Sequence, residues 1–157
     1  MSPNQILQNG INLVESGNLD EGMKLINQAI SLEPSDPEKI HVRAQINSAV
    51  GKHQEAISDY KKCIFYKNDV FQYHYNLANV YFDTRQFAQA VDYYTSAIQI
   101  NPNDSDIYSN RGTCYIQISQ RKLAYEDFKK ALAMNPNDQP AKRGLDILLA
   151  VDPNIGN

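Results

Sequence analysis

Side chains able to perform chemistry are few in this sequence, and their spacing does not bring them together. His41, His53 and His74 fall in three separate predicted helices, without a cysteine or carboxylate at metal-ligand spacing. Cys63 and Cys114 stand alone, and both fall on predicted interior helix faces, where a thiol is buried and unreactive. No glycine-rich phosphate loop is present, and the serines lack a nearby base. We therefore expect no enzyme, no cofactor and no metal site.

Two arginine–aspartate pairs are the charged residues whose spacing is most informative. Arg43 and Arg111 occupy the same position of a 34-residue period, and Asp59 and Asp127 each follow sixteen residues later. The other copies of this position carry neither charge, so arginine and aspartate occur together or not at all. We predict a partly buried ion pair between two neighbouring helices in each case. The alternative is that the arginines reach a ligand.

The elements that must position these residues follow from the same period. The stretch 71–104 reads as two amphipathic helices, with a turn near Arg85 and a stop at Asn101 and Pro102. Small side chains let helix backbones approach closely, and no unit can bury its apolar face alone, so the units must stack. Two rows of small residues and one row of bulky residues recur along the chain: Gly10, Ala44, Ala78 and Gly112; Gly22, Ala56, Ala90 and Ala124; Ile26, Tyr60, Tyr94 and Phe128.

These rows, together with Pro34, Pro102 and Pro136, resemble the tetratricopeptide repeat (TPR). The resemblance covers four repeats, 3–36, 37–70, 71–104 and 105–138, and a final helix over 139–151 is expected to cover the last repeat. It implies an all-α solenoid of about nine helices, in which antiparallel helix pairs form a right-handed superhelix. We expect one TPR domain over 1–151 and a tail over 152–157.

Composition and charge argue against several classes of function. The 157-residue chain has a formal net charge of −3 and 42% hydrophobic residues, which suits a folded domain without a basic stripe for nucleic acid. No apolar run approaches membrane-spanning length, and the first residues lack the features of a signal peptide. We therefore expect neither nucleic acid nor membrane as a partner, and we expect a cytoplasmic location.

The resemblance also implies that the first helix of each repeat lines a concave groove. The acidic residues on that face are Glu15, Glu38, Asp83 and Asp106, and the face carries no lysine or arginine. The carboxylate clamp known in this family needs such cations, so we expect no clamp and a partner segment that is neutral or basic. The predicted peptide-binding residues are Tyr75, Asn76, Asn79, Phe82, Asp83, Asn110, Thr113, His41 and Gln45.

Asparagines are the most distinctive of these groove residues. Asn76 and Asn110 share one repeat position, and Asn79 lies one turn from Asn76. A side-chain amide offers both a donor and an acceptor, so it can pair with the backbone of an extended peptide. Some TPR proteins carry such an asparagine ladder, which this row resembles, and Tyr75 and Phe82 could hold apolar side chains beside it. The alternative is that these amides simply solvate a helix face.

Two functions remain open from the sequence. The first is a non-catalytic protein-binding module or adaptor, whose groove holds a peptide or helix of another protein. The second is a structural or oligomerisation scaffold, a possible homodimer that self-associates through its terminal helices. Apolar residues near both ends favour this alternative, since exposed apolar patches often mark contacts: Leu7, Ile11, Val14, Ile147 and Val151.

Overall fold

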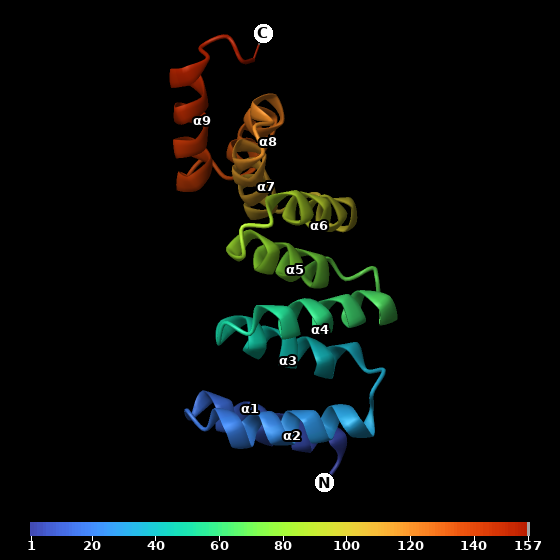
Figure 1. Cartoon of the computed structure of the whole chain (residues 1–157). Coiled ribbons are helices and arrows are strands. Elements are labelled where there is room, and N and C mark those ends of the chain that lie inside the picture. Colours follow the sequence, from blue (N-terminus) through green and yellow to red (C-terminus); the bar gives the residue numbers. More distant parts are fainter. Residues whose placement is uncertain (157) are drawn as a thin grey trace. The chain divides into compact units, whose positions relative to one another are not determined.

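The computed structural model describes residues 1–156, and every regular element in that range is an α-helix. In chain order the described helices are α1 (Pro3–Glu15), α2 (Leu19–Leu32), α3 (Pro37–Ala49), α4 (His53–Tyr66), α5 (Phe71–Asp83), α6 (Phe87–Ile100), α7 (Ser105–Gln117), α8 (Arg121–Met134) and α9 (Gln139–Val151). The first eight form antiparallel pairs joined by short turns, and α9 packs on α8 (Figure 1). The prediction of an all-α repeat fold is confirmed.

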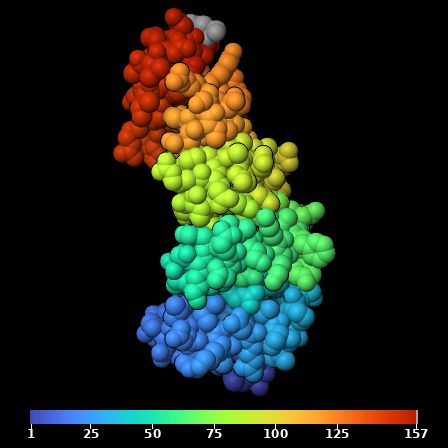
Figure 2. Space-filling model, in the orientation of Figure 1, coloured from blue at the N-terminus to red at the C-terminus, as the bar shows by residue number. Residues whose placement is uncertain are grey.

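The helices divide into two compact units. Unit 1 spans Met1–Asn68 and holds α1 to α4, whereas unit 2 begins at Asp69 and holds α5 to α9. In Figure 2 the red side chains of α9 lie against the orange side chains of α8, so the last helix buries part of its surface within unit 2. The single domain over 1–151 and the tail from 152 stay predictions.

Small residues set the distance between the paired helices. Gly10 of α1 and Gly22 of α2 approach so closely that a Cβ added to Gly10 would lie 2.9 Å from the Gly22 carbonyl oxygen. Gly112 of α7 leaves similar room for Phe128 of α8, whose Cε1 would lie 2.8 Å from an added Cβ. These distances are shorter than van der Waals contact, so larger side chains would push the helices of each pair apart.

All four helix pairs turn through a residue whose backbone is left-handed. The φ angle is +90° at Gly17 and +79° at Gly51, and it is +59° at Arg85 and +64° at Ser119. In each turn the next amide donates to the carbonyl oxygen five residues earlier at 2.8 Å, as expected where a left-handed residue ends a helix. Because glycine adopts this conformation most easily, the turns at Arg85 and Ser119 carry a conformational cost.

Bulky side chains fill the core of each unit, as the period predicts. The bulky row is buried throughout: Ile26, Tyr60, Tyr94 and Phe128. Cys63 and Cys114 are also fully buried, and burial raises the pKa of each thiol to about 12. Both are therefore neutral thiols near pH 7, in agreement with their predicted unreactive positions. Among the described helices, none is both long and apolar enough to cross a membrane.

Candidate binding surface

Both predicted ion pairs are present, each between the two helices of one pair. Arg43 Nε and Nη2 donate to the two carboxylate oxygens of Asp59 at 2.8 Å, and Arg111 makes the same two bonds to Asp127. The two aspartate side chains are only 4% and 7% exposed. Burial raises the pKa of the Asp127 carboxyl although Arg111 opposes this shift, so the attraction in the pair works against a cost of desolvation.

Each arginine has a second partner, bound through a third hydrogen bond, that the sequence reasoning missed. Arg43 Nη1 donates to Asn27 Oδ1 of α2 at 2.7 Å, and Arg111 Nη1 donates to Thr95 Oγ1 of α6 at 2.9 Å. Asn27 and Thr95 both precede their arginine by sixteen residues. Each arginine therefore has one partner sixteen residues before it and one, the aspartate, sixteen residues after it. Each arginine therefore connects its own helix pair to the preceding helix.

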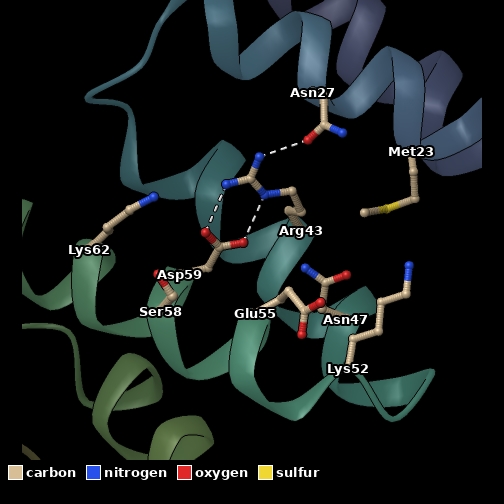
Figure 3. A pocket seen from close by; sticks show the side chains of 9 residues that line it. All are labelled: Met23, Asn27, Arg43, Asn47, Lys52, Glu55, Ser58, Asp59 and Lys62. Atoms are coloured by element: carbon tan, nitrogen blue, oxygen red, sulfur yellow. Dashed lines mark hydrogen bonds and ion pairs between the residues drawn. The ribbon is translucent and has the colours of Figure 1, made fainter.

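The hollow around Arg43 in unit 1 has few features of a ligand site (Figure 3). Its volume is about 370 Å³, and Lys52, Lys62 and Glu55 border it together with the Arg43–Asp59 pair, so charges of both signs surround it. All three guanidinium nitrogens already donate to protein oxygens (Figure 3). None of the described residues that line it belongs to the predicted groove set. The arrangement favours a structural role for Arg43.

A second hollow lies in unit 2, at the N-terminal ends of α7 and α9. Its volume is about 490 Å³. Across it, Asn110 Nδ2 of α7 donates to the Tyr75 hydroxyl of α5 at 3.4 Å. Two carboxylates border it, and none of the described residues that line it is a lysine or arginine. We call this site the acidic hollow and define it by Tyr75, Asp106, Ser109, Asn110, Asp138 and the adjacent residues Asn135, Asn137, Gln139 and Pro140.

A third hollow lies at the C-terminal ends of α5 and α7, also in unit 2. Its volume is about 380 Å³. The rings of Phe82 and Phe87 meet edge to face with centroids 5.7 Å apart, and the Arg85 guanidinium carbon lies 5.8 Å from the Phe87 centroid. Aromatic surface therefore dominates one side of this site. We call it the aromatic hollow and define it by Phe82, Asp83, Arg85, Phe87, Thr113 and Gln117.

Tyrosine hydroxyls hold two of the predicted asparagines. The Tyr94 hydroxyl donates to Asn79 Oδ1 at 2.5 Å, and the Tyr75 hydroxyl accepts from Asn110. Burial raises the pKa of both tyrosines, so both hydroxyls stay protonated near neutral pH. Asn79 and Asn110 therefore do more than solvate a helix face. The part of the asparagine row in peptide binding stays a prediction.

The structure brings some of the nine predicted groove residues together and separates others. Asn76 and Asn79 lie on α5 but line neither hollow of the described unit 2. His41 and Gln45 lie on α3 of unit 1, where burial lowers the pKa of His41 and Gln45 is exposed. Five residues line the two hollows of unit 2: Tyr75, Asn110, Phe82, Asp83 and Thr113. The binding role of all nine stays a prediction.

Asp138 is the residue of this surface that sequence reasoning missed. It caps α9, where its Oδ1 accepts from the Ala141 amide at 2.9 Å and from the Ser109 hydroxyl at 3.2 Å. Its Oδ2 is buried and meets no hydrogen-bond donor among the described residues. Asp36 and Asp104 cap α3 and α7 at the equivalent positions, so the 34-residue period could have predicted that Asp138 caps α9. The period could not have predicted that Oδ2 of Asp138 lacks a hydrogen-bond donor.

The remaining candidate ligands for a metal ion lie apart. Among the residues that the structure describes, no three histidine, cysteine or carboxylate side chains gather where they could share an ion. The His41 ring packs against Tyr60, with centroids 5.9 Å apart, and His74 packs near Tyr93 at 6.3 Å. These histidines therefore contribute to packing between helices.

Comparisons with known proteins find relatives by sequence. A family model described as Tetratricopeptide repeat matches residues 71–104 and 105–138, and a second model of the same description matches residues 40–69. Tetratricopeptide repeat protein 6 of Homo sapiens is 31% identical over 98 residues, which are 62% of this chain and 19% of that protein. Tetratricopeptide repeat protein 16 of Mus musculus is 28% identical over 156 residues, which are 92% of this chain and 20% of that protein. The chain thus spans about a fifth of the length of these relatives.

Solved structures share the fold. The crystal structure of MamA superposes with a TM-score of 0.86 at 19% identity, covering 92% of this chain and 84% of that chain. MamA from Desulfovibrio magneticus RS-1, residue 41 to the end, gives 0.88 at 17% identity, covering 98% and 86%. A tetratricopeptide repeat protein from Parabacteroides merdae gives 0.87 at 24% identity, covering 97% and 60%. At such low identities these likenesses show a common fold and nothing further.

Proposed function

The chain belongs to the tetratricopeptide-repeat family, and from that premise we propose that it is a non-catalytic protein-binding module. The family is one of interaction and scaffold modules, which supports this class of function. The binding surface in this proposal is the part of unit 2 where α5 and α7 meet. It takes a segment of another protein, without a carboxylate clamp.

The observation that carries the proposal is that α5 and α7 contribute side chains to the same two hollows. Tyr75 and Asn110 meet at the acidic hollow, and Phe82 and Thr113 meet at the aromatic hollow. Concave sites that combine apolar surface with a few convergent polar groups are typical of ligand binding. Asn110 and Thr113 lie about one helical turn apart on α7, so a segment that runs along this helix can contact both hollows.

A selection of peptide ligands tests this proposal. A phage-displayed library of random peptides is selected on the immobilised chain, and the recovered peptide is labelled with fluorescein for anisotropy titration. Backbone amide NMR shifts then locate the bound peptide. We expect the largest shift changes at residues of α5 and α7. The proposal fails if no selected peptide perturbs this surface, or if the perturbed residues lie elsewhere in the chain.

The asparagines give the proposal a residue-level prediction. Asn76→Ala and Asn110→Ala are each expected to weaken binding of the selected peptide by about 1 kcal/mol, because each change removes an amide that can pair with a peptide backbone. Asn103→Ala is the matched control, since Asn103 is exposed in the turn before α7 and belongs to neither α5 nor α7. Unchanged affinity in both groove variants would exclude the asparagine row from the binding site.

A cytoplasmic location is a further part of the proposal. Cys63 and Cys114 are free and buried in the described structure. Free cysteines are typical of proteins in reducing compartments, where disulfides are rare.

A self-associating scaffold is the second candidate function, and the exposed side of α9 favours it. Ile147 and Val151 lie one helical turn apart and are 58% and 61% exposed. Leu149 adds a further exposed apolar side chain to this helix. Neighbouring apolar side chains in water often mark a protein contact. In this candidate function, a second copy of the chain covers that side of α9 and a homodimer forms.

A further inference from the structure

We propose that the acidic hollow binds a lysine or arginine side chain of an extended partner segment, and that the aromatic hollow binds an apolar side chain of the same segment. This inference rests on the proposed function, because it specifies which segment the surface of α5 and α7 recognises. Three observations carry it: a buried carboxylate oxygen without a partner, the charge of the acidic hollow, and the spacing of the two hollows along α7.

The unpartnered oxygen belongs to Asp138. This residue is only 6% exposed, and it is one of the residues that line the acidic hollow. Its Oδ1 accepts two hydrogen bonds, whereas its buried Oδ2 meets no donor among the described residues. A buried carboxylate oxygen without a donor is costly, because burial removes water without a replacement. An ammonium or guanidinium group of a partner, placed in the hollow beside Asp138, can offset this cost through its positive charge.

The charge around Asp138 favours a cation. Asp106 adds an exposed carboxylate at the same hollow, and no lysine or arginine lines it among the described residues. The N-terminus of α9 would by itself attract an anion. Asp138 already occupies that position, since its Oδ1 accepts from the Ala141 amide. The Tyr75 ring at the border of the hollow offers an additional surface over which a cation can lie.

The spacing of the two hollows fits an extended segment. Asn110 of the acidic hollow and Gln117 of the aromatic hollow are separated along α7 by about 10 Å, at roughly 1.5 Å per residue. A polyproline II segment places side chains i and i+3 on one side, roughly 9 Å apart. A basic and an apolar residue three positions apart can therefore reach both hollows. Phe82 and Phe87 provide the apolar surface for the second side chain.

The first test is the composition of the peptides recovered from the random library. Peptides that bind the surface of α5 and α7 are expected to share a lysine or arginine and an apolar residue three positions apart. Recovery of binders to this surface that lack the basic residue would overturn the inference while leaving the proposed function intact. Failure of every selected peptide to perturb this surface in NMR spectra would instead overturn the proposed function.

The second test couples Asp138 to the basic side chain. Citrulline, a neutral analogue of arginine, replaces the basic residue of a recovered peptide, and we expect the affinity of the parent chain to fall by about tenfold. In the Asp138→Asn variant the two peptides should differ far less in affinity, because only the exposed carboxylate of Asp106 then remains at the hollow. Asparagine is also a good helix cap, so α9 should remain folded, and thermal melting checks this.

The matched control is Asp104→Asn. Asp104 caps α7 at the equivalent repeat position but does not line the described acidic hollow. This variant loses the same charge, and we expect it to keep the preference for arginine over citrulline. Equal binding of the two peptides by the parent chain would overturn the inference. So would an equal loss of preference in Asp104→Asn and Asp138→Asn, since that would indicate only a general effect of charge.

Discussion

At the scale of single residues, each arginine of the two ion pairs uses all three guanidinium nitrogens. Two bonds reach an aspartate of the following helix, and one reaches a polar residue of the preceding helix. The aspartates could be predicted because they vary together with the arginines along the period. Asn27 and Thr95 differ in type, so no such pattern marked them, although their spacing from the arginine is the same.

Removal of one partner of the pair should be far more damaging than removal of both. Asp127→Ala is expected to lower the free energy of unfolding by about 3–5 kcal/mol, because Arg111 would be left buried without its counter-charge. The double variant Arg111→Leu with Asp127→Tyr copies the residues of the third repeat, Leu77 and Tyr93. It should stay within about 1 kcal/mol of the parent. Urea denaturation followed by circular dichroism measures both values.

The double variant also serves as the control for this experiment. In the third repeat Tyr93 stacks on Tyr81, with ring centroids 5.6 Å apart, and Tyr115 stands at the equivalent position of the fourth repeat. The introduced tyrosine therefore has a ring on which to pack. If Asp127→Ala proves as stable as the double variant, Arg111 is not held in a desolvated pair and our interpretation is wrong.

At the scale of elements, the turns inside the helix pairs show which local backbone features could be predicted from the sequence. The sequence placed one turn near Arg85, and glycine, which adopts the left-handed conformation most easily, stands in the turns at Gly17 and Gly51. The left-handed backbone at Arg85 and Ser119 had no such marker, because neither residue type prefers that conformation. The backbone hydrogen bonds of all four turns impose one geometry, which overrides the local preference of these residues.

Glycine at the left-handed position of the fourth repeat should stabilise the protein. Ser119→Gly is expected to raise the free energy of unfolding by about 0.5–1 kcal/mol, since relief of the left-handed strain exceeds the added entropy of the unfolded chain. Thermal melting by circular dichroism checks this. Gly51→Ser is the reciprocal control and should lower the free energy of unfolding by a similar amount. A Cβ at Gly51 would have no atom within 4 Å, so the left-handed backbone is the source of strain in this variant and no steric clash adds to it. A loss of stability in Ser119→Gly, or a gain of stability in Gly51→Ser, would contradict the argument.

At the scale of the whole molecule, a mild negative charge and an apolar side of α9 are the features that bear on assembly. The net charge of −3 provides little repulsion between copies of the chain. Within unit 2, Leu148 of α9 packs into the core formed with α7 and α8, while Ile147 and Val151 face water. The last helix is therefore buried on one side and carries exposed apolar side chains on the other, which is the observation behind the scaffold candidate.

If the chain forms a homodimer through α9, the mass measured in solution should depend on the exposed apolar residues of that helix. Light scattering after size exclusion should give twice the monomer mass of 17.8 kDa for the parent chain. Ile147→Asp combined with Val151→Asp should restore the monomer mass, because two charges would be buried in the interface. Ala88→Asp on the exposed side of α6 is the control for added charge, and it should remain a dimer. A monomer mass for the parent chain at every concentration would exclude this candidate.

The sequence by itself determined the repeat fold, the closely packed small residues and the two ion pairs. These features depend on contacts between helices that are neighbours along the chain, so a fixed spacing reports them directly. Only the tertiary structure decided that Tyr75 and Phe82 of α5 share hollows with Asn110 and Thr113 of α7. It also decided that one oxygen of Asp138 is buried without a donor. Such features depend on the directions of individual side chains, which a periodic pattern of residue types does not specify.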